Sequence, residues 1–292
     1  MNIRQLSLSA ILCFSFACAW ADVPVRIVTE PEAGCVTIAG ATVADKAYVL
    51  YDDSEAEVVE TAISLFLGDA KSVTSKTFVK RATPDVDKCA IIVGTIGQSK
   101  YIDQLVKDGK LDVKNTEGRW EAYGLATVEN PMEGVPAALV AYGSQPRSTA
   151  YALLEVGRLM GVSPWIWWAD VAPTRKAQLY ATAGKTEVGS PSVKFRGLFI
   201  NDEDWGLKPW AAKKMDPSIN QIGPNTYGRV MELLLRLRAN TLWPAMHACS
   251  RAFWFEKTNI PLVRKYDIYM GSSHCEQMLR DNVYEWNKSG GH

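Results

Sequence analysis

Residues 194–204 read KFRGLFINDED, an apolar run that ends abruptly in polar residues. The apolar side chains can cover both faces of a short strand, as a strand buried inside an α/β layer requires; they are Phe195, Leu198, Phe199 and Ile200. The polar residues that follow are Asn201, Asp202, Glu203 and Asp204. Because parallel α/β folds gather catalytic and binding groups just past the carboxyl ends of their strands, the stretch predicts a buried strand followed by a functional site.

The same pattern occurs twice more toward the C-terminus. A helix is predicted over residues 227–238, with an apolar face of Val230, Leu233, Leu234 and Leu237, and with the charged residues Arg229, Glu232, Arg236 and Arg238 largely opposite. A short strand over 240–243 follows, and His247 and Cys249 come after it. A weaker helix over 262–266 precedes a strand over 268–270, which ends in the polar residues 271–276. This alternation is typical of right-handed parallel units, so we predict an α/β fold.

Residues 22–185 are predicted to form a separate N-terminal α/β domain. Short apolar runs predict strands over residues 48–51, 90–93 and 139–142, and amphipathic patterns predict helices over 55–67, 101–107 and 148–160. The segment 184–192 contains Gly189, Ser190 and Pro191, a composition typical of a linker or of a strand that leads into a new domain. We therefore place a second domain over residues 186–292.

The first 21 residues are predicted to be a signal peptide. Arg4 supplies the positive charge, residues 6–20 the apolar region, and Ala19 and Ala21 a small-x-small cleavage site before Asp22. The apolar region is short for a membrane span, and no later stretch reaches spanning length. We therefore expect export to the periplasm or the extracellular space, with no membrane association after cleavage. A lipid anchor at Cys18 is the weaker alternative, because the residues before it match a lipoprotein cleavage box poorly.

Composition argues against one class of partner and is compatible with another. The formal net charge is zero and neither acidic nor basic residues form a block, so we expect no nucleic-acid partner. The 10 Trp and 11 Tyr residues suit stacking on sugar rings but equally suit a large core. The run SPWIWWAD at 163–170 could be an exposed sugar platform, although aromatic filling of a seam between two domains is the favoured interpretation.

Two further sets of residues, a pair of glycines and the cysteines, are better explained by structural roles than by a functional site or a disulfide bridge. Gly94 and Gly97 could cradle a phosphate, but the glycine fingerprint is incomplete, so a strand-to-helix turn is favoured. Signal cleavage would leave four cysteines in an oxidising compartment, Cys35, Cys89, Cys249 and Cys275. Three pairings are open; Cys249 with Cys275 is the most plausible pair, because each follows a strand end of one predicted sheet, but free buried thiols are favoured over any bridge.

A zinc site is a second reading of the residues that follow the C-terminal strands. The ligand types are His247, Cys249, His274 and Cys275. Adjacent His274 and Cys275 cannot easily reach one metal, and the spacing fits no standard pattern. We therefore predict no metal and no cofactor.

Four strings, in this order, resemble glycoside hydrolase family 115, the xylan α-glucuronidases. They are GVSPWIWWADV (161–171), FRGLFINDED (195–204), LLLRLRANTLWPAM (233–246) and YMGSSHCEQM (269–278), within a match that runs from about Ile91 to the last residue. The resemblance implies an N-terminal α/β domain followed by a (β/α)₈ barrel of the TIM type. It also implies removal of glucuronic acid or its 4-O-methyl ether from xylan, with inversion and without a metal. The implied partner is glucuronoxylan or its oligosaccharides, and a homodimer of the full-length parent is compatible with it.

The resemblance further implies which residues face the sugar. They are Asn201, Asp202 and Glu203 after the first barrel strand, Trp243 after the second, and His274 and Glu276 after the third. A uronic acid offers hydroxyl groups to amide and carboxylate acceptors, a ring face to Trp243, and a carboxylate to protonated His274. We expect Asp202 to matter most for function, the alternative being that it caps the following turn. For Glu203 and Asp204, a structural role as a helix cap or a solvated acid is as well favoured as a role in the sugar site.

Length departs from the family pattern. A (β/α)₈ barrel needs about 250 residues, whereas residues 194–292 hold only three strand patterns. In the family the general acid and the carboxylate that activates water lie on later strands, so we expect the catalytic pair beyond residue 292. The chain would then be a truncated fragment with little glycosidase activity of its own. A carbohydrate-binding protein without turnover is the alternative.

Overall fold

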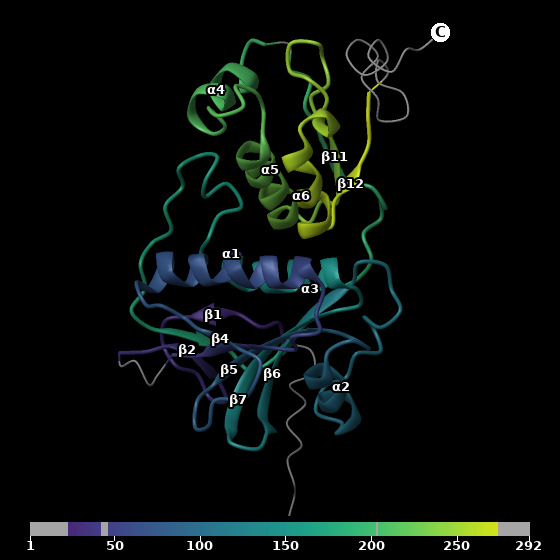
Figure 1. Cartoon of the computed structure of the whole chain (residues 1–292). Helices are drawn as coiled ribbons and strands as arrows, with labels where there is room; N and C mark the ends of the chain where they lie inside the picture. Colours follow the sequence, from purple (N-terminus) through teal and green to yellow (C-terminus); the bar gives the residue numbers. More distant parts are fainter. Residues whose placement is uncertain (1–22, 42–45, 203, 274–292) are drawn as a thin grey trace, which may run out of the picture.

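The chain folds into two α/β units that meet at a layer of helices. The structure is a computed structural model that describes residues 23–41, 46–202 and 204–273, so the predicted signal peptide lies outside it. In Figure 1 the N-terminal sheets lie below helices α1 (Glu57–Thr74) and α3 (Pro146–Leu159), and the C-terminal strands and helices lie above them. The two helices therefore separate the N-terminal sheets from the C-terminal unit.

The larger N-terminal sheet has six strands in the order β4-β3-β5-β7-β6-β9. Their bounds are β3 Tyr48–Tyr51, β4 Lys80–Arg81, β5 Ala90–Thr95, β6 Tyr123–Met132, β7 Val135–Gly143 and β9 Lys185–Val188. β4, β3, β5 and β7 are parallel, whereas β6 and β9 run antiparallel to their neighbours. The strands predicted over 48–51, 90–93 and 139–142 are confirmed. β9 extends this sheet to Val188, past the boundary expected at residue 185.

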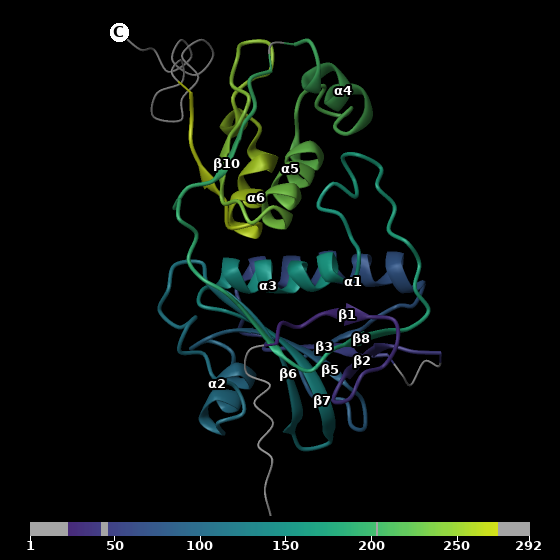
Figure 2. The same ribbon diagram turned by 180° about the vertical axis from the view of Figure 1, so that it is seen from behind.

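Helices cover both faces of this sheet. Alternate residues of β3 point to opposite sides: Val49 packs in the cluster that contains α1 and α3, and Leu50 packs in the cluster that contains α2 (Lys100–Lys107). A second, antiparallel sheet of order β1-β8-β2 lies beside it (Figure 2), with bounds β1 Ile27–Val28, β2 Val36–Ala39 and β8 Leu179–Ala181. The N-terminal unit is therefore a layered α/β structure, as predicted.

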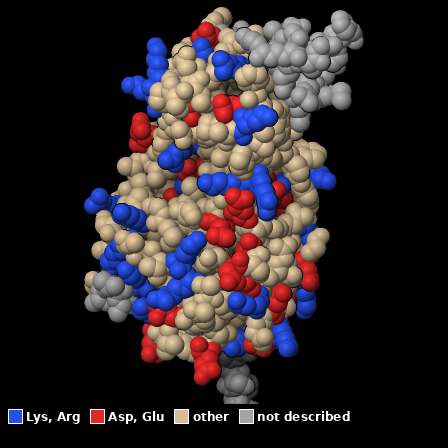
Figure 3. All heavy atoms as spheres, in the orientation of Figure 1, with Lys and Arg blue, Asp and Glu red and all other residues tan. Residues whose placement is uncertain are grey.

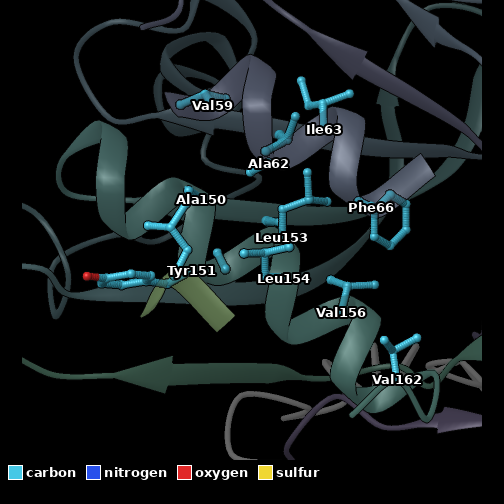
Figure 4. Packing of buried hydrophobic residues seen from close by; sticks show 14 of the residues in the cluster. Val59, Ala62, Ile63, Phe66, Ala150, Tyr151, Leu153, Leu154, Val156 and Val162 are labelled. Carbon is cyan, nitrogen blue, oxygen red and sulfur yellow. The ribbon is translucent and has the colours of Figure 1, made fainter. Parts of the chain in front are cut away.

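Helices α1 and α3 form the centre of the main core (Figure 4). Apolar residues recur every three or four positions on each helix and are buried; they are Val59, Ala62, Ile63 and Phe66 on α1, and Ala150, Leu153, Leu154 and Val156 on α3. Each large side chain among them contributes roughly 1.5–3 kcal/mol relative to exposure to water. α1 continues to Thr74, beyond the predicted end at residue 67, because Ala70 and Val73 extend the same buried stripe.

The C-terminal unit has three parallel strands in the order β10-β11-β12. The strands are β10 Gly197–Phe199, β11 Thr241–Trp243 and β12 Tyr269–Met270; the helices are α4 Leu207–Lys214, α5 Pro224–Arg236 and α6 Ile260–Lys265, with short 3₁₀ turns at Phe253–Phe255 and Lys257–Asn259. Because α5 lies between β10 and β11 in the chain, and α6 between β11 and β12, the predicted alternation of strand and helix is confirmed.

Strand β10 is more exposed than predicted. Leu198 is 40% and Phe199 47% exposed, so the expectation of a strand buried on both faces is wrong. The reason is that β10 lies at the edge of the sheet, whereas Leu242 of the central strand is fully buried in the cluster that includes α5. Phe199 and Trp243 lie on the other face, with ring centroids 5.8 Å apart in an edge-to-face pair, and both stay half exposed.

Half of the polar face predicted for α5, Glu232 and Arg236, is buried at the junction of the two units, whereas Arg229 and Arg238 are not. Glu232 is 5% exposed, and the side chain of Arg236 is 6% exposed. The reason is that α5 packs against α3, and Arg236 donates two hydrogen bonds to Asp69 of α1. Leu237, predicted on the apolar face, is 40% exposed because α5 ends at Arg236.

The aromatic run at 163–170 contacts the C-terminal unit. Trp168 donates its indole N–H to the Arg229 carbonyl at 3.1 Å, and the ring centroids of Trp167 and Trp168 lie 5.9 and 6.0 Å from that of Trp210 on α4. These two residues therefore fill the seam, which was the favoured interpretation. Trp165 is 45% exposed.

The remaining N-terminal features are structural in character. A Cβ at Gly94 would lie 2.4 Å from Ser99, so this glycine is required by packing in the strand-to-helix turn. Cys35 and Cys89 are free thiols. Cys249 forms no disulfide with a described residue, and because Cys275 lies outside the described residues the pairing of these two cysteines stays a prediction. Within the described ranges, no helix combines the length and the apolar character needed to cross a membrane. Acidic and basic side chains are intermixed on the face seen in Figure 3.

Candidate functional site

Polar residues from two neighbouring strands meet at the carboxyl edge of the C-terminal sheet. Asn201 and Asp202 follow β10, and the segment after β11 runs through His247 to Ser250. Because β10 and β11 are parallel and paired, both segments leave the same edge of the sheet. We take this edge as the candidate site.

Asn201 and His247 form the accessible part of the site. Asn201 Oδ1 lies 3.0 Å from His247 Nε2, and since a carbonyl oxygen only accepts, that ring nitrogen is the donor in this arrangement. Asn201 is exposed and His247 is half-buried. The pair presents an amide and an imidazole to solvent, two groups that can bind hydroxyls or a carboxylate. The sequence pattern had marked His247 only as a zinc-ligand type.

Asp202 is buried, and both of its carboxylate oxygens are engaged. It is 8% exposed. Oδ1 accepts from the Leu207 N–H at 3.1 Å, and Oδ2 accepts from the Lys208 N–H and from the Ser250 hydroxyl, both at 3.1 Å. Leu207 and Lys208 are the first residues of α4, so the carboxylate caps that helix, which was the alternative weighed for this residue. A sugar hydroxyl would have to share these oxygens with the cap.

Trp243 lies across the carboxyl end of the neighbouring strand. It is 43% exposed, and a Cβ at Gly271 would lie 2.0 Å from its Nε1. Only glycine at position 271 therefore leaves room for the indole. The accessible part of the ring can stack on the apolar face of a sugar.

The hydroxyl of Tyr227 supports the loop after β11 from inside α5. Tyr227 is fully buried, and burial raises its pKa well above the usual value, with the negative charge of Asp202 acting in the same direction. Its hydroxyl bonds the backbone of Ala245. It therefore stays neutral and holds this loop near Asp202.

Three predicted site residues, Glu203, His274 and Glu276, lie outside the described residues. Asp204 is described, and its carboxylate pairs with Lys208 at 3.1 Å while the side chain stays 46% exposed. Asp204 is thus a solvated acid at the start of α4, one of the two readings considered for it.

The described residues do not form a metal site. Within the three described ranges, no group of three His, Cys, Asp or Glu side chains could hold a metal ion. His247 faces Asn201, whereas Cys249 Sγ lies 3.6 Å from the Ser250 hydroxyl. The other two residues of the zinc alternative, His274 and Cys275, lie outside the described ranges.

Two residues of the structural framework escaped sequence reasoning. Ser250 is 2% exposed, and its hydroxyl donates to Asp202, which ties the two strand-end segments together. Glu121 of the N-terminal unit binds Arg196, which is 75 residues away in the sequence. A lone serine in a loop and a single distant glutamate carry no periodic signal, so neither could be found from the pattern.

A cavity also lies on the N-terminal unit, away from these strand ends. Its volume is ≈ 720 Å³, and residues of β6 and β9 and the loops near Gly34 and Lys110 line it. Its polar lining residues are Lys110, Asp112, Thr127, Glu129 and Lys185, and none of them belongs to the strand-end segments that form the candidate site.

Comparison with known proteins points to one family. Residues 188–292 match the model of glycosyl hydrolase family 115. A solved structure described as a novel family GH115 4-O-methyl-α-glucuronidase, BtGH115A, with specificity for decorated arabinogalactans, has 42% sequence identity and a TM-score of 0.74; the match covers 86% of this chain and 31% of that chain. The chain therefore spans about a third of the length of this relative. A search of the curated proteins gave no match.

Two other solved structures are much less similar. CpGH84D has 10% identity and a TM-score of 0.48, covering 86% of this chain and 36% of that chain. A mutant β-hexosaminidase of Streptomyces plicatus has 12% identity and a TM-score of 0.43, covering 74% of this chain and 32% of that chain. Both TM-scores lie below 0.5.

Proposed function

The chain belongs to glycosyl hydrolase family 115, and we propose that it is part of an exported α-glucuronidase. The proposed reaction removes glucuronic acid, or its 4-O-methyl ether, from side branches of xylan or of arabinogalactan. The observation that carries this proposal is the 42% identity, over 86% of the chain, with a 4-O-methyl-α-glucuronidase. We call the whole enzyme of this proposal the parent protein.

In this proposal β10, β11 and β12 are three strands of a (β/α)₈ barrel. Their parallel pairing, the helices between them and the polar carboxyl edge support the assignment. The half-exposed face that carries Phe199 and Trp243 would then look into the barrel. The barrel domain would begin after β9, which ends at Val188.

The residues at the carboxyl edge are proposed to bind the sugar. Asn201 and His247 would bind hydroxyls or the uronate carboxylate, and Trp243 would stack on the ring. Asp202 would act chiefly by holding Asn201 and the start of α4 in place, since its oxygens are already engaged. An inverting enzyme needs two carboxyl groups about 6.5–9.5 Å apart, and we propose that strands other than β10–β12 supply them.

The proposed localisation outside the cytoplasm agrees with a polysaccharide substrate. A signal peptide over residues 1–21 would export the protein to the periplasm or beyond the cell, where a polysaccharide is accessible. No cofactor is required for the proposed hydrolysis, because general acid and base catalysis by carboxyl groups suffices.

The activity is tested by assaying the purified parent protein on glucuronoxylan and on decorated arabinogalactan. We expect release of glucuronic acid at about 1–10³ s⁻¹, with inverted configuration in the first product. The 292-residue chain alone should release none under the same conditions. No release by the parent protein from either polysaccharide would contradict the activity, and comparable turnover by the chain alone would contradict the partial barrel.

A carbohydrate-binding role without turnover is the second candidate, and the half-exposed Trp243 favours it. Acidic xylo-oligosaccharides added to the parent protein would then change its tryptophan fluorescence without being cleaved. Cleavage of the same oligosaccharides would exclude this candidate.

A further inference from the structure

A single carboxylate of the N-terminal unit contacts the residues before β10 and β11 and is linked through Arg147 to the start of β12. Glu121 precedes β6 and is 2% exposed. Its Oε2 accepts from Arg196, the residue before β10, and its Oε1 accepts at 2.8 Å from the amide of Asn240, the residue before β11. Oε1 also accepts at 2.8 Å from Arg147, whose other terminal nitrogen lies 3.0 Å from Asp267, two residues before β12.

Asn240 joins the three strand starts to one another. Its Oδ1 accepts from the Arg196 N–H at 3.0 Å, and its backbone oxygen accepts from the Tyr269 N–H at 2.8 Å. Its amide nitrogen donates to Glu121. The central strand is thus bonded to both neighbours and to the N-terminal unit through one residue.

The charges of this cluster balance around a buried pair, Glu121 and Arg147. Glu121 and Asp267 are negative, and Arg147 and Arg196 are positive. The Glu121 side chain is 0% and the Arg147 side chain 5% exposed, whereas those of Arg196 and Asp267 are 23% and 46% exposed, so the central pair is the buried one. Charges removed from water in this way tolerate only an arrangement that pairs them, so the cluster has strong geometric specificity.

The cluster is needed to fix the register of the strands because they are very short. β10 and β11 have three residues each, and β12 has two, so their own ladder of hydrogen bonds fixes the register weakly. A slip of one residue would turn Trp243 to the helix-covered face and Leu242 to the open face. The cluster holds the starts of the strands, and the candidate site lies at their ends.

We infer that Glu121 is a positioning residue for the candidate sugar site. It sets the register of β10, β11 and β12 from the N-terminal unit, and so aligns Asn201 and Trp243. The N-terminal unit then helps to position the residues of the sugar site. The predicted effect of Glu121 on kcat/KM rests on the proposed function, because it presupposes glucuronidase activity.

The test is Glu121→Gln in the parent protein. A glutamine would turn an amide N–H₂ toward a guanidinium or toward the Asn240 amide, so one strand start loses its acceptor. We expect kcat/KM on glucuronoxylan to fall at least tenfold, mainly through kcat, at a temperature well below Tm. The matched control is Asp69→Asn, which breaks the buried contact with Arg236 but touches no strand start. The control should lower Tm while kcat/KM stays within about twofold of wild type, since distant sites act independently. A Glu121→Gln protein that behaves like this control overturns the inference.

A second variant and a second measurement test the inference if Glu121→Gln does not fold or if the parent protein shows no activity. If Glu121→Gln fails to fold, Asn240→Ala replaces it with the same expectation and the same control. Hydrogen exchange of residues 240–243 and 268–271 in the parent protein should be faster in either variant than in Asp69→Asn, and equal exchange overturns the inference. A wild-type parent protein without glucuronidase activity would defeat the proposed function but would leave this exchange test intact.

Discussion

Asp69 of α1 and Arg236 of α5 form a two-pronged ion pair across the junction of the two units, with oxygen–nitrogen distances of 2.8 and 2.9 Å. Their side chains are only 3% and 6% exposed. Arg236 also bonds Glu232 on its own helix at 2.9 Å. One guanidinium therefore serves two buried carboxylates, and it cannot be left half-paired without a large penalty.

Asp69→Asn should destabilise the protein by about 3 kcal/mol, because it leaves a buried charge incompletely paired. The measurement is the free energy of unfolding in urea. The control is Glu32→Gln, which removes the exposed pair between Arg26 and Glu32 and should cost about 1 kcal/mol or less. Similar losses for the two variants would contradict a structural role for the buried pair.

Glu55 should make stability fall as the pH rises. It is 6% exposed, and its carboxylate accepts from the Thr95 N–H at 2.6 Å and from the Thr95 hydroxyl at 2.8 Å. Burial raises the pKa of Glu55 above its usual value, and nearby Asp52 acts in the same direction. The folded state then keeps a proton that the unfolded chain has already lost. The stability contributed by this group is therefore complete below its unfolded pKa and is lost as the pH rises through the folded pKa.

Glu55→Gln removes this pH dependence, because an amide does not ionise. Between about pH 4.5 and pH 7, the variant should lose less free energy of unfolding than the wild type. Urea unfolding at both pH values gives the comparison, with the exposed Glu57→Gln as the control. Parallel curves for wild type and Glu55→Gln would contradict the raised pKa.

The fold was predictable where local pattern decides the structure. The strands at 48–51 and 90–93 and the helices α1 and α3 follow from apolar periodicity alone. The exposure of Phe199 and the burial of Glu232 could not be predicted from periodicity, because each depends on which other element packs against that residue. The partner that helps bury α5 at the junction, Asp69, is 167 residues from Arg236 in the sequence.

The candidate site was predictable only as a location. The rule that polar groups gather at carboxyl strand ends predicted Asn201 at the sheet edge, and the family resemblance, not this rule, predicted Trp243 beside it. The pairing of Asn201 with His247 and the bond from Ser250 to Asp202 depend on loop conformations that no sequence periodicity encodes.

Gly271→Ala should displace Trp243. The new methyl group would start 2.0 Å from the indole nitrogen, so the ring must move. We expect a shift in tryptophan fluorescence and, in the parent protein, a KM on glucuronoxylan at least tenfold higher, about 1.4 kcal/mol of lost binding. Gly189→Ala is the control, because a Cβ there meets no atom within 4 Å. An unchanged KM would argue against stacking on Trp243.

The last prediction concerns Asp202, for which capping and sugar binding lead to different outcomes. Its two oxygens accept from two N–H groups of α4 and from Ser250. Asp202→Asn would set an amide N–H₂ against one of these donors, so we expect a loss of about 1–2 kcal/mol in the free energy of unfolding. Ser250→Ala removes a single donor and should cost less. In the parent protein, capping alone predicts that kcat/KM falls less than tenfold at temperatures where Asp202→Asn is folded. A larger fall with an unchanged Tm would instead mean that the carboxylate exchanges one of these bonds for a sugar hydroxyl during the reaction, and Asp202 would then belong to the substrate pocket.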